Sequence, residues 1–260
     1  MKLIRIVLKY LQYLLISKGK YNLHSPFLYN IVSKIILNSK TKDLKDIIEL
    51  RSQLNKNESI ININDFGEGS TINKSKQRKI KDIAKNSAKN SKFGMLLYRI
   101  VSFFKPKIII EIGTSLGIST SYIAKASPDS KIYTLEGCSE TIKIAQQNFS
   151  HLGLKNIKII KGDFKDTLDR TISQIEDIDL AFVDGNHNQH ATLEYFNLIM
   201  ENVNENAILI FDDIHWSNDM EKAWNKIKES SKVKLTIDLF FVGLVFIDKK
   251  LSKENYIIRF

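Results

Sequence analysis

The stretch IIIEIGTSLGIST, residues 108–120, decides the fold of this chain. Its continuous apolar run is typical of a strand that is covered on both faces. The run leads into an acidic residue, Glu111, and into a short loop with glycines at 113 and 117. Because a helix opens at Ser119, free backbone N–H groups and one carboxylate come to a common point. The stretch therefore predicts a strand–loop–helix unit that binds a nucleotide-like ligand.

Strands and helices alternate from residue 107 onward. Apolar runs predict seven strands, at 107–112, 131–136, 157–160, 178–183, 206–211, 234–240 and 243–248. Helical spacing predicts five helices, at 118–127, 139–150, 165–175, 189–203 and 217–229. Such alternation implies right-handed crossovers, but the last two strands are too close in sequence for a parallel crossover and should pair antiparallel. The prediction is an α/β fold with a Rossmann-like, seven-stranded, doubly wound sheet whose last strand is antiparallel.

The composition indicates a globular protein from a reducing compartment. The chain has 260 residues, of which 43% are hydrophobic, so it can bury a substantial core. Its one cysteine, Cys138, excludes an intramolecular disulfide framework. We therefore expect a cytoplasmic protein, with peripheral attachment to a membrane as the alternative.

Basic residues are concentrated in the first part of the chain. Residues 1–100 hold 20 Lys and Arg against 7 Asp and Glu, a net of +13, whereas residues 101–260 hold 19 against 22, a net of −3. We therefore divide the chain into a basic, mainly helical extension over 1–104 and an α/β ligand-binding domain over 105–260. A basic surface can attract nucleic acid, anionic lipid or acidic substrates, and it can equally be an ordinary solvated surface.

Residues 1–16 predict an apolar helix with one narrow polar stripe, formed by Lys2, Arg5, Lys9 and Gln12. The segment is too short and too interrupted by charge to span a bilayer, and it lacks the cleavage site of a signal peptide. Residues 1–20 could lie at a membrane interface with lysines toward the headgroups. The favoured reading is a helix that docks on the protein's own core or on a second subunit, as in a homodimer.

The rest of the extension has one clear cap signal. Ser25 fits a helix N-cap and Pro26 the first helical position. Further helices are expected at Thr41–Lys56, Ser75–Ser91 and Phe93–Phe104, with an edge strand or ordered loop at Ser59–Phe66. Candidates for a lid over the substrate are His24, Ser25 and Gly67–Ser70.

The loop after the first strand offers Gly113, Thr114, Ser115 and Gly117 as ligand contacts. Ligands of such sheets bind beyond the carboxyl ends of the strands. A dinucleotide fingerprint would need glycines at 113, 115 and 118, and this chain has serine and isoleucine at the last two positions. The carboxylate of Glu111 suits a cationic group, either by pairing with an ammonium or by acting through water. The loop therefore points away from NAD.

Two more acidic residues follow the next two strands. Glu136 ends KIYTLE, where it can accept hydrogen bonds from both hydroxyls of a ribose. In the Gly162-Asp163-Phe164 step, the carboxylate can accept an adenine amino proton and the ring can flank the base. Acidic residues at strand ends are also common as simple helix caps. Each of these acids therefore indicates a ligand site only in combination with the others.

With these residues in this order, the chain resembles class I S-adenosylmethionine-dependent methyltransferases over residues 107–248. The E-x-G-x-x-x-G loop, the acid that ends the second strand, the Gly-Asp-Phe step and the antiparallel ending carry the resemblance. It implies that residues 111–117 hold the methionine part of S-adenosylmethionine. The ribose would be held by Glu136 and Gly137, and the adenine by Asp163 and Phe164.

A second group of acids follows the fourth and fifth strands, in AFVDGNH (181–187) and IFDDIHWS (210–217). If those strands are neighbours, the carboxylates of Asp184, Asp212 and Asp213 converge, and their repulsion and desolvation are costly. A divalent cation such as Mg²⁺, with oxygen ligands, would relieve that cost. Alternatively, Asp212 and Asp213 only cap the helix after Trp216.

This acidic group is similar to that of the metal-dependent O-methyltransferases, whose fourth strand ends D-x-x-K or D-x-x-H and whose fifth ends D-N or D-D. The resemblance implies Asp184, Asp212 and Asp213 as metal ligands, Asp184 as a further cofactor and catalytic residue, and His187 as the catalytic base. His187 replaces the lysine of many small-molecule relatives and Asp213 the commoner asparagine, which argues against a simple catechol-type substrate. His187 could instead only orient Asp184, and we expect His190 and His215 to be structural.

The expected function is S-adenosylmethionine-dependent O-methylation, assisted by a divalent cation. The acceptor would be a small-molecule, glycosylated or lipid-linked hydroxyl. The alternatives are a methyltransferase of RNA or protein and a non-catalytic protein of the membrane surface with a retained cofactor pocket. The sequence has no evident RNA-binding signature and no Asn-Pro-Pro-Tyr-type motif after the fourth strand, so nucleic acid is not the expected partner.

Overall fold

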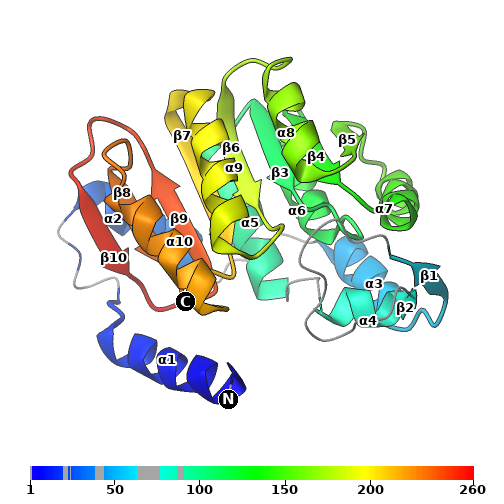
Figure 1. Ribbon diagram of the computed structural model, residues 1–260, viewed down its shortest axis with the longest axis horizontal. Coiled ribbons are helices and arrows are strands. Elements are labelled where there is room, and N and C mark those ends of the chain that lie inside the picture. Colours follow the sequence, from blue (N-terminus) through cyan, green and yellow to red (C-terminus); the bar gives the residue numbers. More distant parts are fainter. Residues whose placement is uncertain (1, 20–22, 24, 39–43, 64–76, 87–90) are drawn as a thin grey trace. The chain divides into compact units, whose positions relative to one another are not determined.

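The structure is a computed structural model that describes residues 2–19, 23, 25–38, 44–63, 77–86 and 91–260 (Figure 1). It has an α/β fold with a mostly parallel sheet of eight strands, which confirms the predicted fold class with one strand more than expected. The chain forms two compact units, residues 40–176 and residues 1–39 with 177–260. The unit of residues 40–176 contains residues on both sides of the 104/105 boundary that composition suggested. That boundary stays a prediction.

The unit of residues 40–176 contains the strand that decided the fold. Three parallel strands follow one another in the order β3-β4-β5, with Ile110 opposite Tyr133 and Thr134 opposite Ile159. Their bounds are β3 (Ile108–Ile112), β4 (Lys131–Glu136) and β5 (Ile157–Lys161), and the helices after them are α6 (Ile118–Ala126), α7 (Ser139–His151) and α8 (Phe164–Ile172). Every residue of β3 is buried, as its continuous apolar run predicts.

The same unit holds most of the N-terminal extension. Its helices are α3 (Lys45–Leu54), α4 (Ile80–Asn86) and α5 (Ser91–Phe104), and its small antiparallel sheet consists of β1 (Ile60–Asn62) and β2 (Gln77–Lys79). The predicted helix over Ser75–Ser91 is therefore wrong for residues 77–79. These three residues pair with β1 instead, because backbone hydrogen bonds to a neighbouring strand outweigh a weak local helix preference. Residues 87–90, like the candidate lid residues His24 and Gly67–Ser70, lie outside the described part of the chain.

The second unit carries the antiparallel end of the sheet. Its five strands have the order β10-β8-β9-β7-β6, and their bounds are β6 (Ile178–Val183), β7 (Val203–Asp212), β8 (Leu235–Asp238), β9 (Val242–Phe246) and β10 (Glu254–Ile257). β9 runs antiparallel to β7 and β8, which confirms the predicted pairing of the last two predicted strands. β10 was not predicted, and it pairs parallel with β8. Helices α9 (Gln189–Glu201) and α10 (Asn218–Glu229) lie in front of these strands in Figure 1.

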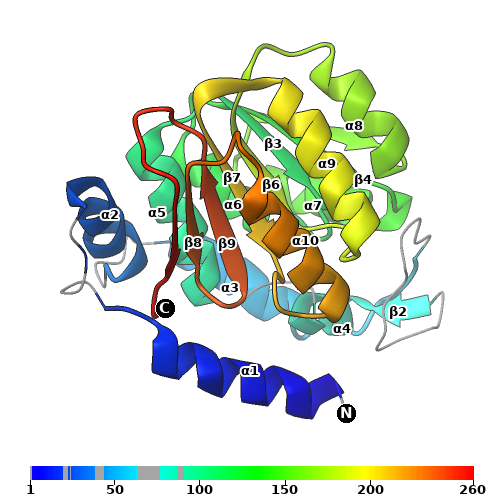
Figure 2. The ribbon, with the colours of Figure 1, turned by 60° about the vertical axis from the view of Figure 1, so that its left-hand side comes forward.

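The start of the chain belongs to this second unit as well. Helix α1 (Lys2–Ile16) is followed by α2 (Pro26–Ile31) and by a short π-helix, η2 (Val32–Ile36). Ser25 caps α2 by accepting a hydrogen bond from the backbone of Leu28, and Pro26 is the first helical residue, as predicted. Figure 2 shows α1, in dark blue, beside the carboxyl end of the chain. The Tyr13 hydroxyl accordingly donates a hydrogen bond to the carbonyl oxygen of Ile258 over 2.5 Å.

Candidate functional site

The loop after β3 is a tight, left-handed turn. Gly113, Ser115 and Gly117 all have positive φ angles, of 102°, 48° and 78°. A Cβ atom on Gly117 would lie 2.5 Å from the ring of Phe149, closer than real Cβ contacts allow. Glycine is thus required at 117 for two separate reasons, the backbone conformation and the space. Gly117 directly precedes α6, so the loop delivers the unpaired N–H groups of a helix N-terminus.

Glu111 is fully buried beneath this loop. Its Oε2 atom accepts hydrogen bonds from the hydroxyls of Thr120 and Thr134, each over 2.6 Å. Among the described residues, its Oε1 atom has no hydrogen-bond partner. Burial raises the pKa of Glu111 to about 7, against the opposing effect of the two hydroxyls. With no exposed surface, the carboxylate links β3 to α6 and β4 through these two hydroxyls.

Glu136, at the end of β4, is oriented by two backbone N–H groups. Its Oε2 atom accepts a hydrogen bond from Ser115 and its Oε1 atom one from Cys138, both over 2.8 Å. Burial raises the pKa of Glu136, and these hydrogen bonds act in the opposite direction. The side chain is therefore held in one orientation at the end of β4. Gly137, the other candidate ribose contact, lies between Glu136 and Cys138 in the sequence.

The remaining candidate ligand residues of this unit have visible structural roles. Thr114 is buried, and its hydroxyl lies 2.6 Å from that of Thr134, the threonine that also binds Glu111. Asp163 caps α8 by accepting a hydrogen bond from the backbone N–H of Lys165 over 2.9 Å, so the helix-cap reading of this acid is confirmed. Phe164 is half-buried at the first position of that helix.

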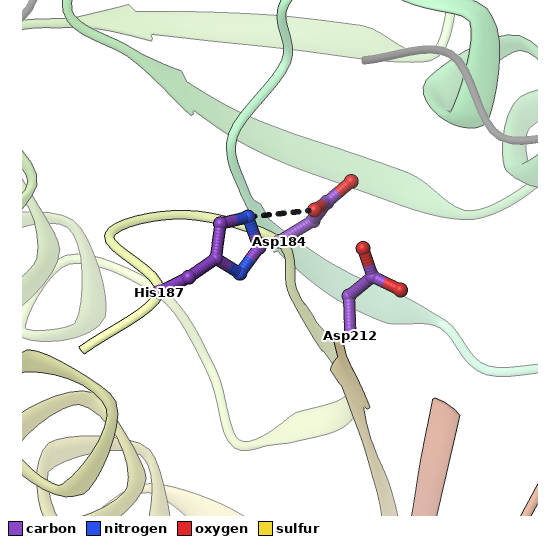
Figure 3. Close-up of side chains that lie close together, drawn as sticks. All are labelled: Asp184, His187 and Asp212. Atoms are coloured by element: carbon purple, nitrogen blue, oxygen red, sulfur yellow. Dashed lines mark ion pairs between the residues drawn. The ribbon is translucent and has the colours of Figure 1, made fainter. Parts of the chain in front are cut away.

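In the other unit, Asp184, His187 and Asp212 converge (Figure 3). Each residue offers one ligand atom, and these atoms all lie within 4.8 Å of one another. The register explains the convergence of the carboxylates, because β6 and β7 are parallel neighbours with Val183 opposite Phe211. The residue that follows β6 and the residue that ends β7 therefore lie at the same edge of the sheet. This confirms the neighbouring-strand condition on which the predicted acidic group depended.

The burial of the three side chains differs. Asp212 is 1% exposed, whereas the side chains of Asp184 and His187 are 15% and 34% exposed. The Nε2 atom of His187 lies 3.6 Å from Oδ1 of Asp184, which is beyond a direct hydrogen bond. The arrangement thus has a buried carboxylate at its base and an imidazole at its accessible side.

The turn that carries His187 is held on both sides. Asn186 adopts a left-handed backbone, and its amide donates a hydrogen bond to the hydroxyl of Tyr195 over 2.7 Å. Asn188 caps α9 by accepting a hydrogen bond from the backbone of Ala191 over 2.9 Å. Sequence reasoning missed both asparagines, although asparagine in a left-handed turn and at a helix N-cap is a familiar signal.

Asp213 is not part of this convergent group. Its backbone is left-handed, with φ of 52°, and its carbonyl oxygen accepts a hydrogen bond from the backbone of Trp216 over 2.9 Å. The cap of α10 is Ser217, whose hydroxyl accepts from the backbone of Met220. The alternative in which Asp212 and Asp213 cap that helix is therefore wrong. The assignment of Asp213 as a metal ligand stays a prediction.

His215 belongs to a separate charged network. Its Nε2 atom lies 2.8 Å from Oδ2 of Asp238, and its Nδ1 atom lies 3.2 Å from Oε1 of Glu221. Burial lowers the pKa of His215, but these two carboxylates outweigh burial and the net direction is upward. The Trp224 indole also donates to Asp238. His215 is thus structural, as expected, whereas His190 lies on the surface, 3.7 Å from Glu194.

Comparison with known proteins gives a family for the middle of the chain. Residues 110–214 match the sequence family described as "Methyltransferase domain". Release factor glutamine methyltransferase of Escherichia coli is 32% identical over 60 residues, which are 23% of this chain and 22% of that protein. Catechol O-methyltransferase B of Danio rerio is 32% identical over 95 residues, 35% of this chain and 36% of that protein. The matches thus span only between a fifth and about a third of these relatives.

Solved structures support the fold over a longer stretch. The O-methyltransferase of Bacillus cereus, solved with SAH, has a TM-score of 0.57 at 18% identity and covers 81% of this chain and 93% of its own. The O-methyltransferase TomG of Streptomyces achromogenes, solved with SAM, has a TM-score of 0.54 at 19% identity, with coverages of 62% and 82%. At these identities the likeness establishes the fold alone, which is that of the class I methyltransferases.

Proposed function

We propose that this chain, which carries a methyltransferase domain of the class I fold over residues 110–214, transfers a methyl group from S-adenosylmethionine to a hydroxyl oxygen. One observation carries the proposal. The matched stretch contains Glu111, Glu136, Asp163, Asp184 and Asp212, so the candidate donor residues and the convergent acidic group fall within one methyltransferase match. The two partners of the reaction are assigned to different residues, the donor to residues 111–164 and the acceptor to the group of Asp184, His187 and Asp212.

The donor residues suit S-adenosylmethionine. Glu136 presents a carboxylate that two N–H groups already orient, as a ribose diol requires. The turn around Gly117 leaves backbone N–H groups for the carboxylate of the methionine part. The buried Oε1 atom of Glu111 can accept a hydrogen bond through a water that binds the ammonium group.

The acidic group suits a divalent cation. The carboxylates of Asp184 and Asp212, which offer ligand atoms within 4.8 Å of each other, are oxygen donors of the kind that Mg²⁺ or Mn²⁺ accepts. We assign Asp184 and Asp212 as ligands. A cation held there would lower the pKa of the acceptor hydroxyl.

His187 is assigned as the base. It is the most exposed member of the group, so it can reach an acceptor while Asp184 limits the orientation of its ring. The hydroxyl proton passes to the imidazole, the oxygen forms a bond to the methyl carbon, and the bond from that carbon to the sulfonium sulfur breaks. The products are a methyl ether, a neutral thioether and a protonated His187. The protein's contribution is mainly positioning and exclusion of water.

Oxygen is favoured over nitrogen as the acceptor atom. The residues after β6 are Asp184-Gly185-Asn186-His187, so the Asn-Pro-Pro-Tyr-type motif that marks one group of amide and amino methyltransferases is not present there. The histidine at 187 also favours an acceptor other than a simple catechol.

Titration calorimetry of the full chain with S-adenosylmethionine tests the core of the proposal. We expect saturable binding that weakens in Glu136→Ala. A folded protein that binds neither S-adenosylmethionine nor its demethylated product would sink the proposal. Incubation of a cell extract with the chain and with donor labelled on its methyl group would then identify the acceptor. Label that resists the conditions that cleave methyl esters and stays on an oxygen is the expected outcome, and label found only on nitrogen or carbon contradicts it.

A further inference from the structure

The outer face of α1 is aliphatic and exposed. Residues at spacings of three and four along a helix share one face. Five such side chains are at least half exposed, namely Ile4 (65%), Val7 (50%), Leu8 (61%), Leu11 (52%) and Leu15 (86%). A helix on the surface of a globular protein normally turns such a face toward the core. In α1 the aliphatic face points outward instead.

The polar side of the helix explains this orientation. Arg5 and Lys9 both form ion pairs with Oε2 of Glu221 on α10, at 2.7 Å and 3.3 Å. Tyr13 is bonded to the last residues of the chain, and the Tyr10 ring packs edge-on against Phe240 with centroids 5.0 Å apart. Polar and aromatic contacts thus attach one side of α1 to its own unit, and the aliphatic side is left facing outward.

A neighbouring aromatic side chain extends this outward surface. Phe241 lies in the turn between β8 and β9, is 50% exposed and has its ring centroid 6.1 Å from that of Tyr10. Aromatic residues beside an aliphatic face are typical of segments at the boundary between lipid and water.

Charge decides which partner fits this surface. Residues 1–42 contain eight Lys and Arg and no Asp or Glu. A second copy of the chain, meeting the first through the same face, would bring two basic segments together, which is unfavourable. An anionic lipid surface offers both an apolar phase for the leucines and opposite charge for those lysines and arginines that are not paired with Glu221, each worth about 1 kcal/mol near such a surface.

We propose that α1, together with Phe241, binds the surface of an anionic lipid bilayer. With 15 residues the helix is about 22 Å long, shorter than the roughly 30 Å of a hydrocarbon core. In the described part of the chain, no helix is long and apolar enough to cross a membrane. The helix therefore lies along the interface, with Ile4, Leu8, Leu11 and Leu15 among the acyl chains. This inference stands independently of the proposed reaction.

Flotation of the full chain with lipid vesicles tests the inference. One set of vesicles contains phosphatidylcholine alone and the other contains phosphatidylglycerol as well. We expect binding to the anionic vesicles that weakens with added salt. Leu11→Glu should reduce that binding by roughly tenfold or more, because a leucine is lost from the lipid and a negative charge is placed against it.

Ile48→Glu is the matched control. Ile48 lies on α3 and is 52% exposed, the same fraction as Leu11, so the two variants make the same change on surfaces of equal exposure. The control should bind vesicles as the wild type does. Equal vesicle binding by wild type, Leu11→Glu and Ile48→Glu would overturn the inference. So would a dimer, measured by analytical ultracentrifugation, that Leu11→Glu dissociates while the wild type ignores anionic vesicles. Circular dichroism of each variant verifies that it is folded.

Discussion

The backbone N–H of Ser115 donates a hydrogen bond to Oε2 of Glu136, with 2.8 Å between nitrogen and oxygen. One side chain thereby fixes the loop after β3 and presents itself at the end of β4. Loss of that carboxylate should remove both a ribose acceptor and the tether of the loop.

Glu136→Ala is therefore expected to weaken S-adenosylmethionine binding by roughly tenfold to a hundredfold, the usual value of hydrogen bonds to a charged group. Titration calorimetry measures the dissociation constant directly. Glu140→Ala, which removes an acid from the first turn of α7, should leave the constant unchanged. Equal constants for wild type and Glu136→Ala would remove the residue from the cofactor site.

The buried Glu111 should make stability depend on pH. Its pKa is about 7 in the folded protein against 4.5 for the unfolded reference, so the folded state binds more protons between these values. The free energy of unfolding should therefore fall as pH rises from about 4.5 to 7, by up to roughly 3 kcal/mol. Urea titrations of wild type and Glu111→Gln at pH 5 and pH 8 measure it. The difference between the two pH values should shrink in Glu111→Gln and persist in Glu205→Gln, a change at an exposed residue of β7.

The convergence of Asp184, His187 and Asp212 leads to a prediction about metal affinity. Asp212→Asn should weaken Mn²⁺ binding by at least roughly tenfold, because it removes a buried charged ligand. Asp213→Asn is the neighbouring control and should have the smaller effect. Calorimetry with the metal alone distinguishes them. A larger loss in Asp213→Asn would restore the ligand assignment that the resemblance implies.

The role of His187 can be measured once an acceptor has been identified. His187→Ala should lower kcat by roughly 10²–10⁴ if the imidazole takes the hydroxyl proton. The dissociation constant of S-adenosylmethionine should stay the same, since none of the donor contacts involves this residue. A normal kcat would leave His187 with no part in proton transfer.

Substitutions at Gly117 and Gly153 allow the free-energy cost of backbone strain to be separated from the cost of a steric clash. Both have left-handed backbones, with φ of 78° and 66°, but a Cβ on Gly153 meets nothing within 4 Å, whereas one on Gly117 would contact Phe149. Gly153→Ala should cost about 1 kcal/mol of unfolding free energy from its backbone conformation alone. Gly117→Ala should cost roughly 2–4 kcal/mol, because overpacking is added. Chemical denaturation measures both, and equal costs would mean that Phe149 moves aside freely.

Most of the main sheet could be predicted from the sequence. The strands at 131–136 and 178–183 have the predicted bounds. The second is a mainly apolar run, as is typical of a buried parallel strand, and both lie between helices of ordinary length. β10 was missed because Glu254-Asn255-Tyr256-Ile257 is a short, polar edge strand without such a run. β2 was missed because its lysine and arginine suit a helix locally, and only the pairing with β1 makes it a strand.

The candidate site was predictable in its residues more than in its contacts. The ends of two strands indicated that Asp184 and Asp212 lie together. The full burial of Glu111 and the left-handed turn at Asp213 depend on packing and backbone geometry that a pattern of letters does not contain. For α1, the sequence indicated a polar stripe but not the side that faces the protein, since the decisive partner, Glu221, lies more than 200 residues away.

The two ends of the chain are fastened to each other. Besides its bond to Ile258, the Tyr13 hydroxyl accepts a hydrogen bond from the backbone N–H of Phe260, and Lys18 pairs with the backbone of Ile257. Deleting the first helix to gain solubility would therefore free the last strand's end and leave Glu221 without Arg5 and Lys9. Loss of activity in such a shortened protein would therefore not show whether the first helix binds lipid. For that reason, surface substitutions in the intact polypeptide, and affinity tags joined through long linkers, are the sound way to study the first helix.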